Sequence, residues 1–279
     1  MQAWLSRYLG RLWLLAVYGF LYLPLGFMIV FSFNSTKQDA RFTGFSWRWY
    51  EALLNDRKLV EGFFTSLQIA TITGVLSVVL GTFAAFVMVR YAKFWGRTLF
   101  TSMANAPLVM PEVIIGLSLL LLMAGTQNFL GWPERGMGTI VIGHTLLGMA
   151  YAMVVVRSRL QEVDRSLEDA AMDLGAKPHQ VFFLVTLPNI AQALVAAFLL
   201  SFTLSFDDVV IAEFLSGPGV NTLPQVVFGY ARRGINPTVY AAASLLILVL
   251  SCGVLAYSIA VARRMRRLAR ESRAAVTAS

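Results

Sequence analysis

The sequence predicts an all-α polytopic membrane protein with six transmembrane helices. Hydrophobic residues make up 57% of the chain and charged residues only 14%, and the mean hydropathy is +0.67. The apolar runs are about as long as the roughly 20 residues that a helix needs to cross a bilayer. They are far longer than barrel strands, and none alternates between polar and apolar residues. A soluble globular protein is therefore excluded.

The predicted spans follow one another along the chain and form a single transmembrane domain over residues 1–279. The first run is too long for a signal peptide and ends without a small-residue cleavage site, so we expect it to stay as an anchor. The spans are Leu12–Phe31, Phe64–Val89, Leu99–Ala124, Gly138–Val156, Ile190–Phe214 and Val239–Ala262.

Basic residues in short loops set the expected orientation. Arg90, Lys93 and Arg97 follow the second span without an acidic residue among them, and a tail with six arginines, which begins at Arg263, follows the sixth. Both termini are therefore expected in the cytoplasm. Most of the net charge of +8 is explained by this topology and by anchoring at anionic lipid, so nucleic acid is not an expected partner.

Two external loops carry local signals. In the loop Asn34–Gly62, the stretch Ser46–Leu54 predicts a short amphipathic helix that a serine caps, with aromatic residues suited to the membrane surface. In the other loop, Gly217-Pro218-Gly219 and Thr222-Leu223-Pro224 are strong turn signals. We expect that loop to be ordered.

The third span contains two helix-disturbing prolines, Pro107 and Pro111. Each removes a backbone donor and favours a kink or a broken helix that can line a cavity. Elsewhere in the spans, Gly74, Gly81 and Gly116 are expected to permit close contact between helices.

The apolar spans contain carboxylates but no Lys or Arg in their interiors. Ionisable groups at such depth cost about 2.5–3.5 kcal/mol to insert and usually face a pathway. The candidates Glu112, Asp207 and Asp208 therefore indicate a cationic cargo. The alternative is that they pair locally, for example with Arg232 or Arg233, or accept structural hydrogen bonds.

Three aromatic side chains in the fourth and fifth spans are further candidates for contact with the same cargo. Phe202, Phe206 and Tyr151 could bind alkylammonium groups through cation–π attraction, worth roughly 0.5–2 kcal/mol each. The alternative is that they only pack within the helix bundle.

The polar segment 157–189 lies between the fourth and fifth spans. Leu167, Ala170, Ala171 and Leu174 share one face of a predicted helix, which ends at Gly175. Helices that rest on lipid favour Lys and Arg, whereas this one is acidic. The pattern favours a docked protein partner over a lipid-resting or internal helix.

The sequence contains no motif for a nucleotide-binding or metal-binding site. The chain has no Gly-x-x-x-x-Gly-Lys-Ser/Thr phosphate loop, so no nucleotide cofactor is expected in this chain. The histidines, His144 and His179, share no metal-ligand spacing, and Cys252 is the single cysteine. We expect no metal site, and His144 is expected to form hydrogen bonds within the bundle.

The polar segment resembles a known motif. Asp169-Ala170-Ala171, then Gly175, then Val185-Thr186-Leu187-Pro188 is similar in every spacing to the EAA motif of permease subunits in ABC importers, with Asp169 in place of Glu and Val185 in place of Ile. The resemblance implies the type I importer permease fold. It also implies that Leu167–Gly175 is a coupling helix seated on an ATPase subunit, together with Leu187 and Pro188.

Three further stretches narrow the resemblance to the second permease subunit of putrescine or spermidine importers. They are Ala106–Glu112, Ser205–Ile211 and Gly217–Pro224, with Glu112 where that family would have Asp. The resemblance implies a bacterial inner membrane, a second, related permease chain, two ATPase subunits that bind ATP, and a periplasmic polyamine-binding protein. Each permease would form half of the pathway and would not itself be an enzyme.

Two alternatives stay open. Related permeases carry sulfate or ferric ion; an interior without cations suits an oxyanion poorly, whereas ferric ion would tolerate carboxylates. The other alternative is a stand-alone carrier coupled to protons, or an intramembrane enzyme.

Overall fold

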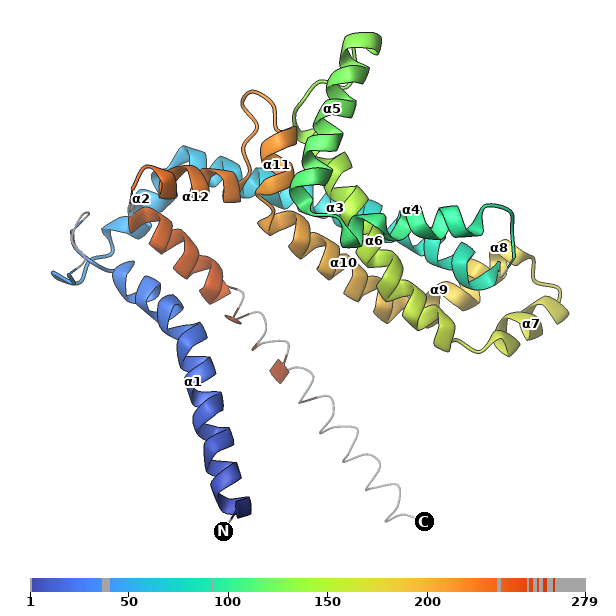
Figure 1. Cartoon of the computed structure of the whole chain (residues 1–279), viewed down its shortest axis with the longest axis horizontal. Helices are drawn as coiled ribbons and strands as arrows, with labels where there is room; N and C mark the ends of the chain where they lie inside the picture. Colours follow the sequence, from blue (N-terminus) through green and yellow to red (C-terminus); the bar gives the residue numbers. More distant parts are fainter. Residues whose placement is uncertain are drawn as a thin grey trace. The chain divides into compact units, whose positions relative to one another are not determined.

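The computed structural model describes residues 2–36, 41–91, 93–234 and 237–249, with a few single positions beyond them (Figure 1). Within these ranges the chain is helical, without a β-strand, which confirms the all-α class. The helices are α1 Gln2–Phe31, α2 Arg48–Asn55, α3 Arg57–Arg90, α4 Arg97–Val109, α5 Glu112–Leu130, α6 Met137–Glu162, α7 Arg165–Asp173, α8 Pro178–Val181, the π-helical turn η1 Phe182–Thr186, α9 Leu187–Asn189, α10 Ala191–Asp207, α11 Val210–Leu215, α12 Leu223–Arg232 and an apolar helix Pro237–Val249.

The chain consists of two compact units, each with its own internal contacts between residues. The first comprises residues 1–56 and 230–279, and the second comprises residues 57–229. A single domain over the whole chain stays a prediction.

The core of the second unit is formed where α3, α6 and α10 pack side by side (Figure 1). Two buried apolar clusters lie along these helices. One includes Ala85, Met153 and Ile190, and the other includes Ile69 and Ile211. The helices also carry large exposed apolar residues on their outer faces, as a helix does when its surroundings are lipid.

Glycines bring α3 very close to α6. A Cβ at Gly81 would lie 2.8 Å from the Cβ of Ala152 and from the backbone nitrogen of Met153. A Cβ at Gly74 or Gly116 would meet a phenylalanine ring of α10 or α11. The structure therefore agrees with the prediction that these three glycines permit close helix contacts.

The predicted third span, Leu99–Ala124, differs from the structure, which divides it into α4 and α5. The break lies at Met110 and Pro111, whose ψ angles are 137° and 135°. A residue before proline is disfavoured in the helical region, so Met110 adopts an extended conformation. Glu112 consequently begins α5 instead of lying near the middle of one long helix.

The predicted fifth span, Ile190–Phe214, is also divided. α10 ends at Asp207, and α11 begins at Val210 after an extended Asp208. At its other end, α10 follows the short helical segment Pro178–Asn189, and the chain bends by 72° between the two.

The helices that are long and apolar enough to cross a bilayer agree in part with the six predicted spans. Among the described residues, α1, α3, α5 and α6 are long and apolar enough to cross a bilayer, and α10 with the segment before it could form a fifth span. The chain is thus a multi-pass membrane protein. The sixth predicted span, Val239–Ala262, overlaps Pro237–Val249 and then runs largely outside the described residues, as does the basic tail. The count of six and the cytoplasmic termini stay predictions.

The first unit contains the predicted amphipathic helix as α2. It begins at Arg48, and Ser46 Oγ accepts a hydrogen bond from the Arg48 backbone (3.3 Å) but does not occupy the N-cap position. Of the aromatic side chains in this stretch, Trp49 is buried and donates to the carbonyl of Asn34 (2.6 Å), whereas Trp47 is 58% exposed. The rings of Phe33, Trp47 and Tyr50 pack together.

The close approach of α3 and α6 gives a test of the packing. Gly81→Ala should destabilise the chain by about 1–3 kcal/mol, because the new methyl group meets backbone atoms of α6 that cannot move aside. Thermal unfolding of the purified chain in detergent would show a Tm several degrees lower. Gly125→Ala is the matched control, since a Cβ there meets nothing within 4 Å, and an equal loss in both variants would contradict the packing argument.

Candidate functional site

The polar segment 157–189 contains the predicted short helix as α7 and continues through α8, η1 and α9. Asp164 precedes α7 and accepts a hydrogen bond from the backbone N–H of Ser166 (3.0 Å), which holds the pKa of Asp164 below its usual range. After α7, Gly175 has φ +89°, a left-handed conformation that glycine adopts without strain. The helix therefore begins and ends where its capping residues specify.

The apolar stripe of α7 is not used in the packing of this chain. No residue of α7 is buried, and the side chain of Leu174 is 90% exposed. Beside the stripe lies an open hollow of about 400 Å³, whose lining includes Ala171, Leu174, Gly175, Val181 and Leu184. An exposed apolar stripe next to a hollow is typical of a surface that a partner covers.

The predicted coupling residues lie on or next to α7 and on α9. Asp169 and Ala170 are exposed on α7, Leu167 is 48% exposed, and Pro188 is exposed on α9. Leu187 is half-buried beside it. Their role in docking an ATPase stays a prediction.

The sequence reasoning missed Glu168, the neighbour of the motif carboxylate. Its Oε1 lies 2.6 Å from Nη2 of Arg90 at the end of α3, and the two side chains are only 12% and 10% exposed. Thr186 Oγ1 donates to the same oxygen (2.8 Å). The available signal was the pair of adjacent acids, Glu168 and Asp169, whose side chains point about 100° apart around a helix and can therefore meet different neighbours.

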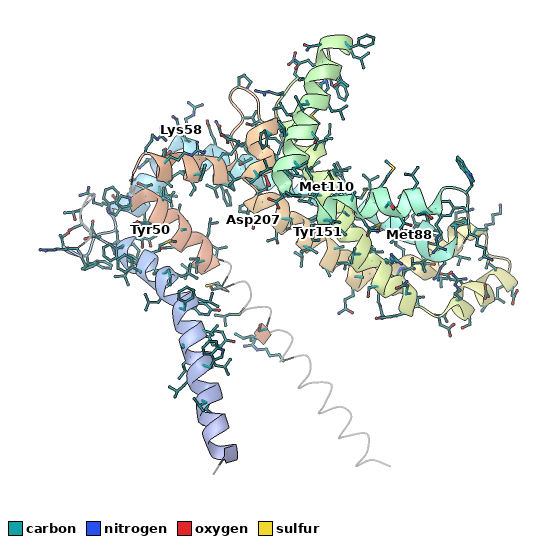
Figure 2. The ribbon with its side chains drawn as sticks, in the orientation of Figure 1. Tyr50, Lys58, Met88, Met110, Tyr151 and Asp207 are labelled. Atoms are coloured by element: carbon teal, nitrogen blue, oxygen red, sulfur yellow. The ribbon has the colours of Figure 1, made fainter. Side chains whose placement is uncertain are left out.

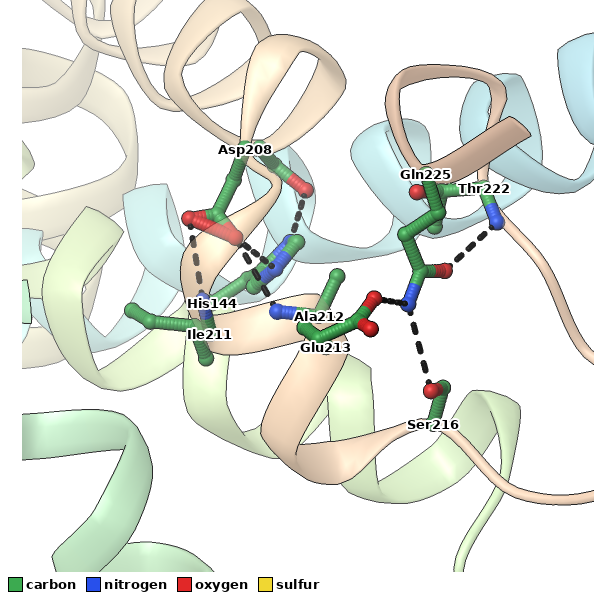
Figure 3. Close-up of polar contacts among 9 residues, drawn as sticks. His144, Asp208, Ile211, Ala212, Glu213, Ser216, Thr222 and Gln225 are labelled. Carbon is green, nitrogen blue, oxygen red and sulfur yellow. Dashed lines mark hydrogen bonds and ion pairs between the residues drawn. The ribbon is translucent and has the colours of Figure 1, made fainter. Parts of the chain in front are cut away.

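At the other end of α10, Asp208 stabilises the break before α11. Its carboxylate accepts hydrogen bonds from the backbone N–H groups of Ile211 (3.4 Å) and Ala212 (3.0 Å), which α11 cannot satisfy within one turn (Figure 3). His144 Nε2 on α6 lies 3.4 Å from Asp208 Oδ1, and His144 Nδ1 lies 2.7 Å from Ser205 Oγ. His144 is therefore a hydrogen-bonded residue of the bundle, as predicted.

The Ser205–His144–Asp208 cluster has the residue types of a hydrolase triad, but it leaves no room for a substrate. The cavity beside it has a volume of about 10 Å³, which is enough for at most one water molecule. The cluster is consequently built as a structural support for the helix break.

The other two predicted carboxylates, Glu112 and Asp207, are exposed. Glu112 begins α5 and Asp207 ends α10. Glu112 lies within electrostatic reach of both Asp207 and Asp208. Two helix breaks thus bring three carboxylates into one region. The alternative of local pairing with Arg232 or Arg233 stays a prediction.

Aromatic rings line the same end of α10. Phe202 and Phe206 stack with centroids 5.8 Å apart, and Phe63 of α3 meets Phe206 edge-on at 6.1 Å. Both rings of the stack are half-buried. Figure 2 labels Asp207 on α10 and Tyr151 on α6, and Tyr151 is half-buried against the apolar cluster around Ile211. The stack and Asp207 together offer an apolar surface beside a negative charge.

The loop after α11 is ordered, as predicted, by the side chain of Gln225. This side chain accepts from the backbone of Thr222 (2.8 Å) and donates to Glu213 (3.1 Å) and Ser216 (3.2 Å), as Figure 3 shows. At the same end of the unit, Thr139 donates to the carbonyl of Leu215 (2.7 Å).

The described residues contain no group of three or more His, Cys, Asp or Glu side chains placed to hold a metal ion.

Comparison with known proteins places the chain among transport proteins. Residues 77–267 match the family described as binding-protein-dependent transport system inner membrane component. The chain is 49% identical over 235 residues to the putrescine transport system permease protein PotI of Escherichia coli, which covers 84% of each chain. It is 32% identical to the spermidine/putrescine transport system permease protein PotC of Haemophilus influenzae, over 93% of this chain and 99% of the relative.

Solved structures share the fold. A chain of a bacterial ABC transporter involved in the import of the acidic polysaccharide alginate superimposes with a TM-score of 0.72 and 16% identity, over 92% of this chain and 97% of that one. A chain of the MetNI methionine ABC transporter gives a TM-score of 0.55 and 21% identity, over 69% and 88%.

The two adjacent aspartates should differ in their effect on stability. Asp208→Ala removes the acceptor for two backbone N–H groups and the partner of His144, so we expect a loss of at least about 1–2 kcal/mol, the usual worth of a helix cap. Asp207→Ala should stay within about 0.5 kcal/mol, as exposed substitutions usually do. Thermal unfolding in detergent measures both, and equal losses would show that the capping role is wrong.

Proposed function

The chain belongs to the family of binding-protein-dependent transport system inner membrane components, and we propose that it is the permease subunit that admits a polyamine such as putrescine across a bacterial inner membrane. In this proposal the six predicted spans of one chain supply half of a translocation pathway. The chain moves its cargo and catalyses no reaction.

The main support for a polyamine cargo is the group of exposed carboxylates. Glu112 and Asp207 form no ion pair among the described residues, and Asp208 lies beside them. The interiors of the spans contain no Lys or Arg, so the charge of this region is available to a cation. A diamine suits the region well, because its two ammonium groups can meet separate carboxylates while its methylene groups lie against Phe202 and Phe206.

The names of the relatives agree with this cargo. PotI is a putrescine permease by name and PotC a spermidine/putrescine permease. Similarity over most of the chain includes the stretches that contain the three carboxylates, which supports the transfer of the cargo class to this protein.

The assembly follows from the exposed stripe of α7. In our proposal an ATPase subunit covers Leu167, Ala170, Ala171 and Leu174, and binds the ATP that this chain does not bind. A second permease, a distinct but related chain, contributes the other half of the pathway with its own ATPase. A periplasmic polyamine-binding protein delivers the cargo, and one solved relative is an alginate transporter in complex with its periplasmic protein.

Neutralising the exposed carboxylates tests the cargo. Glu112→Gln and Asp207→Asn should each raise the putrescine concentration for half-maximal uptake by about ten-fold or more, since a hydrogen bond to a charged group is worth about 1.5–3 kcal/mol. Uptake of labelled putrescine by proteoliposomes that contain the full assembly is the measurement.

Glu134→Gln is the matched control, because Glu134 is an exposed acid in a loop away from the helix breaks. Unchanged uptake in both pathway variants would remove the carboxylates from the pathway. Uptake of ferric ion or sulfate in place of putrescine would favour the related permeases, and uptake by this chain without ATPase or binding protein would favour a stand-alone carrier.

A charge on the apolar stripe tests the docking surface. Leu174→Asp should abolish co-purification of the ATPase with the permease, because an exposed leucine at the centre of an apolar contact would become a buried carboxylate. Asp173→Asn alters the neighbouring side chain, which lies off the stripe, and should leave co-purification intact. Retention of the ATPase by Leu174→Asp would show that it docks elsewhere.

A further inference from the structure

We propose that α3 transmits the motion of α7 to α12, through an ion pair between Arg90 and Glu168 at one end and a hydrogen bond between Ser66 and Leu223 at the other. In this arrangement Arg90 and Glu168 are positioning residues for transport. The inference rests on the proposed function, because it assumes that an ATPase moves α7.

The covalent link to α7 does not itself fix the position of that helix. α6 ends at Glu162, and the two residues before α7, Val163 and Asp164, are extended, with ψ angles of 123° and 125°. Extended residues between two helices allow the second helix to change its angle. The orientation of α7 must therefore come from contacts with other elements.

Those contacts are made with the end of α3. Glu168 Oε1 meets Arg90 Nη2 at 2.6 Å, and Arg165 Nη2 donates to the carbonyl of Val89 at 2.8 Å. Thr186 donates to the same carboxylate oxygen at 2.8 Å and so includes η1 in the cluster. Because the side chains of Arg90 and Glu168 are almost buried, solvent screens their attraction little. A displacement of α7 is thus carried to α3.

α3 is suited to carry that displacement over a long distance. It is one continuous helix of 34 residues without an internal proline, so its length is about 51 Å at 1.5 Å per residue. Its buried face contains many small residues, including Gly74, Ser77 and Gly81, which pack closely against α6 and α10.

At its other end α3 holds the beginning of α12. Ser66 Oγ accepts a hydrogen bond from the backbone N–H of Leu223 at 2.9 Å, and both residues are buried. A Cβ on Gly62 would lie 3.3 Å from the backbone of Leu223 and from Val226, so α12 is seated directly on α3. Arg90 and Ser66 are 24 positions apart in one helix, or about 36 Å. The same helix thus contacts α7 at one end and α12 at the other.

The ion pair is tested in the complete transporter, reconstituted with its ATPase, partner permease and binding protein. Glu168→Gln should lower the number of putrescine molecules taken up per ATP hydrolysed by about five-fold or more, in the range of typical coupling between sites. The ATPase should still co-purify, because the apolar stripe of α7 is intact. The matched control is Glu162→Gln, which breaks the exposed pair with Arg159 (2.7 Å) and should leave the ratio unchanged.

Hydrogen exchange at the backbone amide of Leu223 tests the connection from α7 through α3 to α12. It does not depend on which cargo is transported. In the wild-type assembly, exchange at this amide should change when a non-hydrolysable ATP analogue closes the ATPase. Glu168→Gln and Ser66→Ala should each abolish that change, whereas Glu162→Gln should retain it.

The inference is overturned if Glu168→Gln keeps both the uptake ratio and the response at Leu223. It is also overturned if uptake and hydrolysis fall in parallel with loss of the ATPase, since Glu168 would then only support docking. If the wild-type assembly takes up no polyamine while Leu223 still responds to the analogue through Glu168, the proposed cargo fails and the inference about α3 stands.

Discussion

Every backbone polar group within a bilayer must find a partner inside the protein, and this constraint decides how the chain is built. Continuous helices such as α3 satisfy it within themselves. Where a helix breaks, a side chain must supply the missing partner, and Asp208 does so for α11 as Thr139 does for the carbonyl of Leu215. The breaks also lie next to Glu112, Asp207 and Asp208, the carboxylates of the proposed pathway.

Local patterns predicted the helices well because the apolar runs are long and their ends carry clear signals. Gly175 and Pro111 acted as local rules require, the first ending a helix and the second forcing Met110 out of one. The division of the spans at Asp208 was not predicted, because it depends on a carboxylate that can serve backbone groups three and four residues later.

The candidate site was predicted less completely, since its contacts join residues far apart in sequence. The motif directed attention to Asp169, whereas the neighbouring Glu168 forms the buried ion pair with Arg90, 78 positions earlier. His144 and Asp208 likewise meet across two helices. In both pairs, the sequence around one residue contains no pattern that predicts its partner.

Asp207 and Asp208 differ in how freely they can be substituted, because only Asp208 forms hydrogen bonds that support the helix break. Asp208 holds the break before α11 through its hydrogen bonds, so substitutions at that position should lower the stability of the fold. Asp207 has an exposed side chain with no such obligation, and mutations there can be sampled without loss of folding. In the proposed pathway, cargo preference can therefore change by substitution at Asp207, while Asp208 keeps the helix break in place.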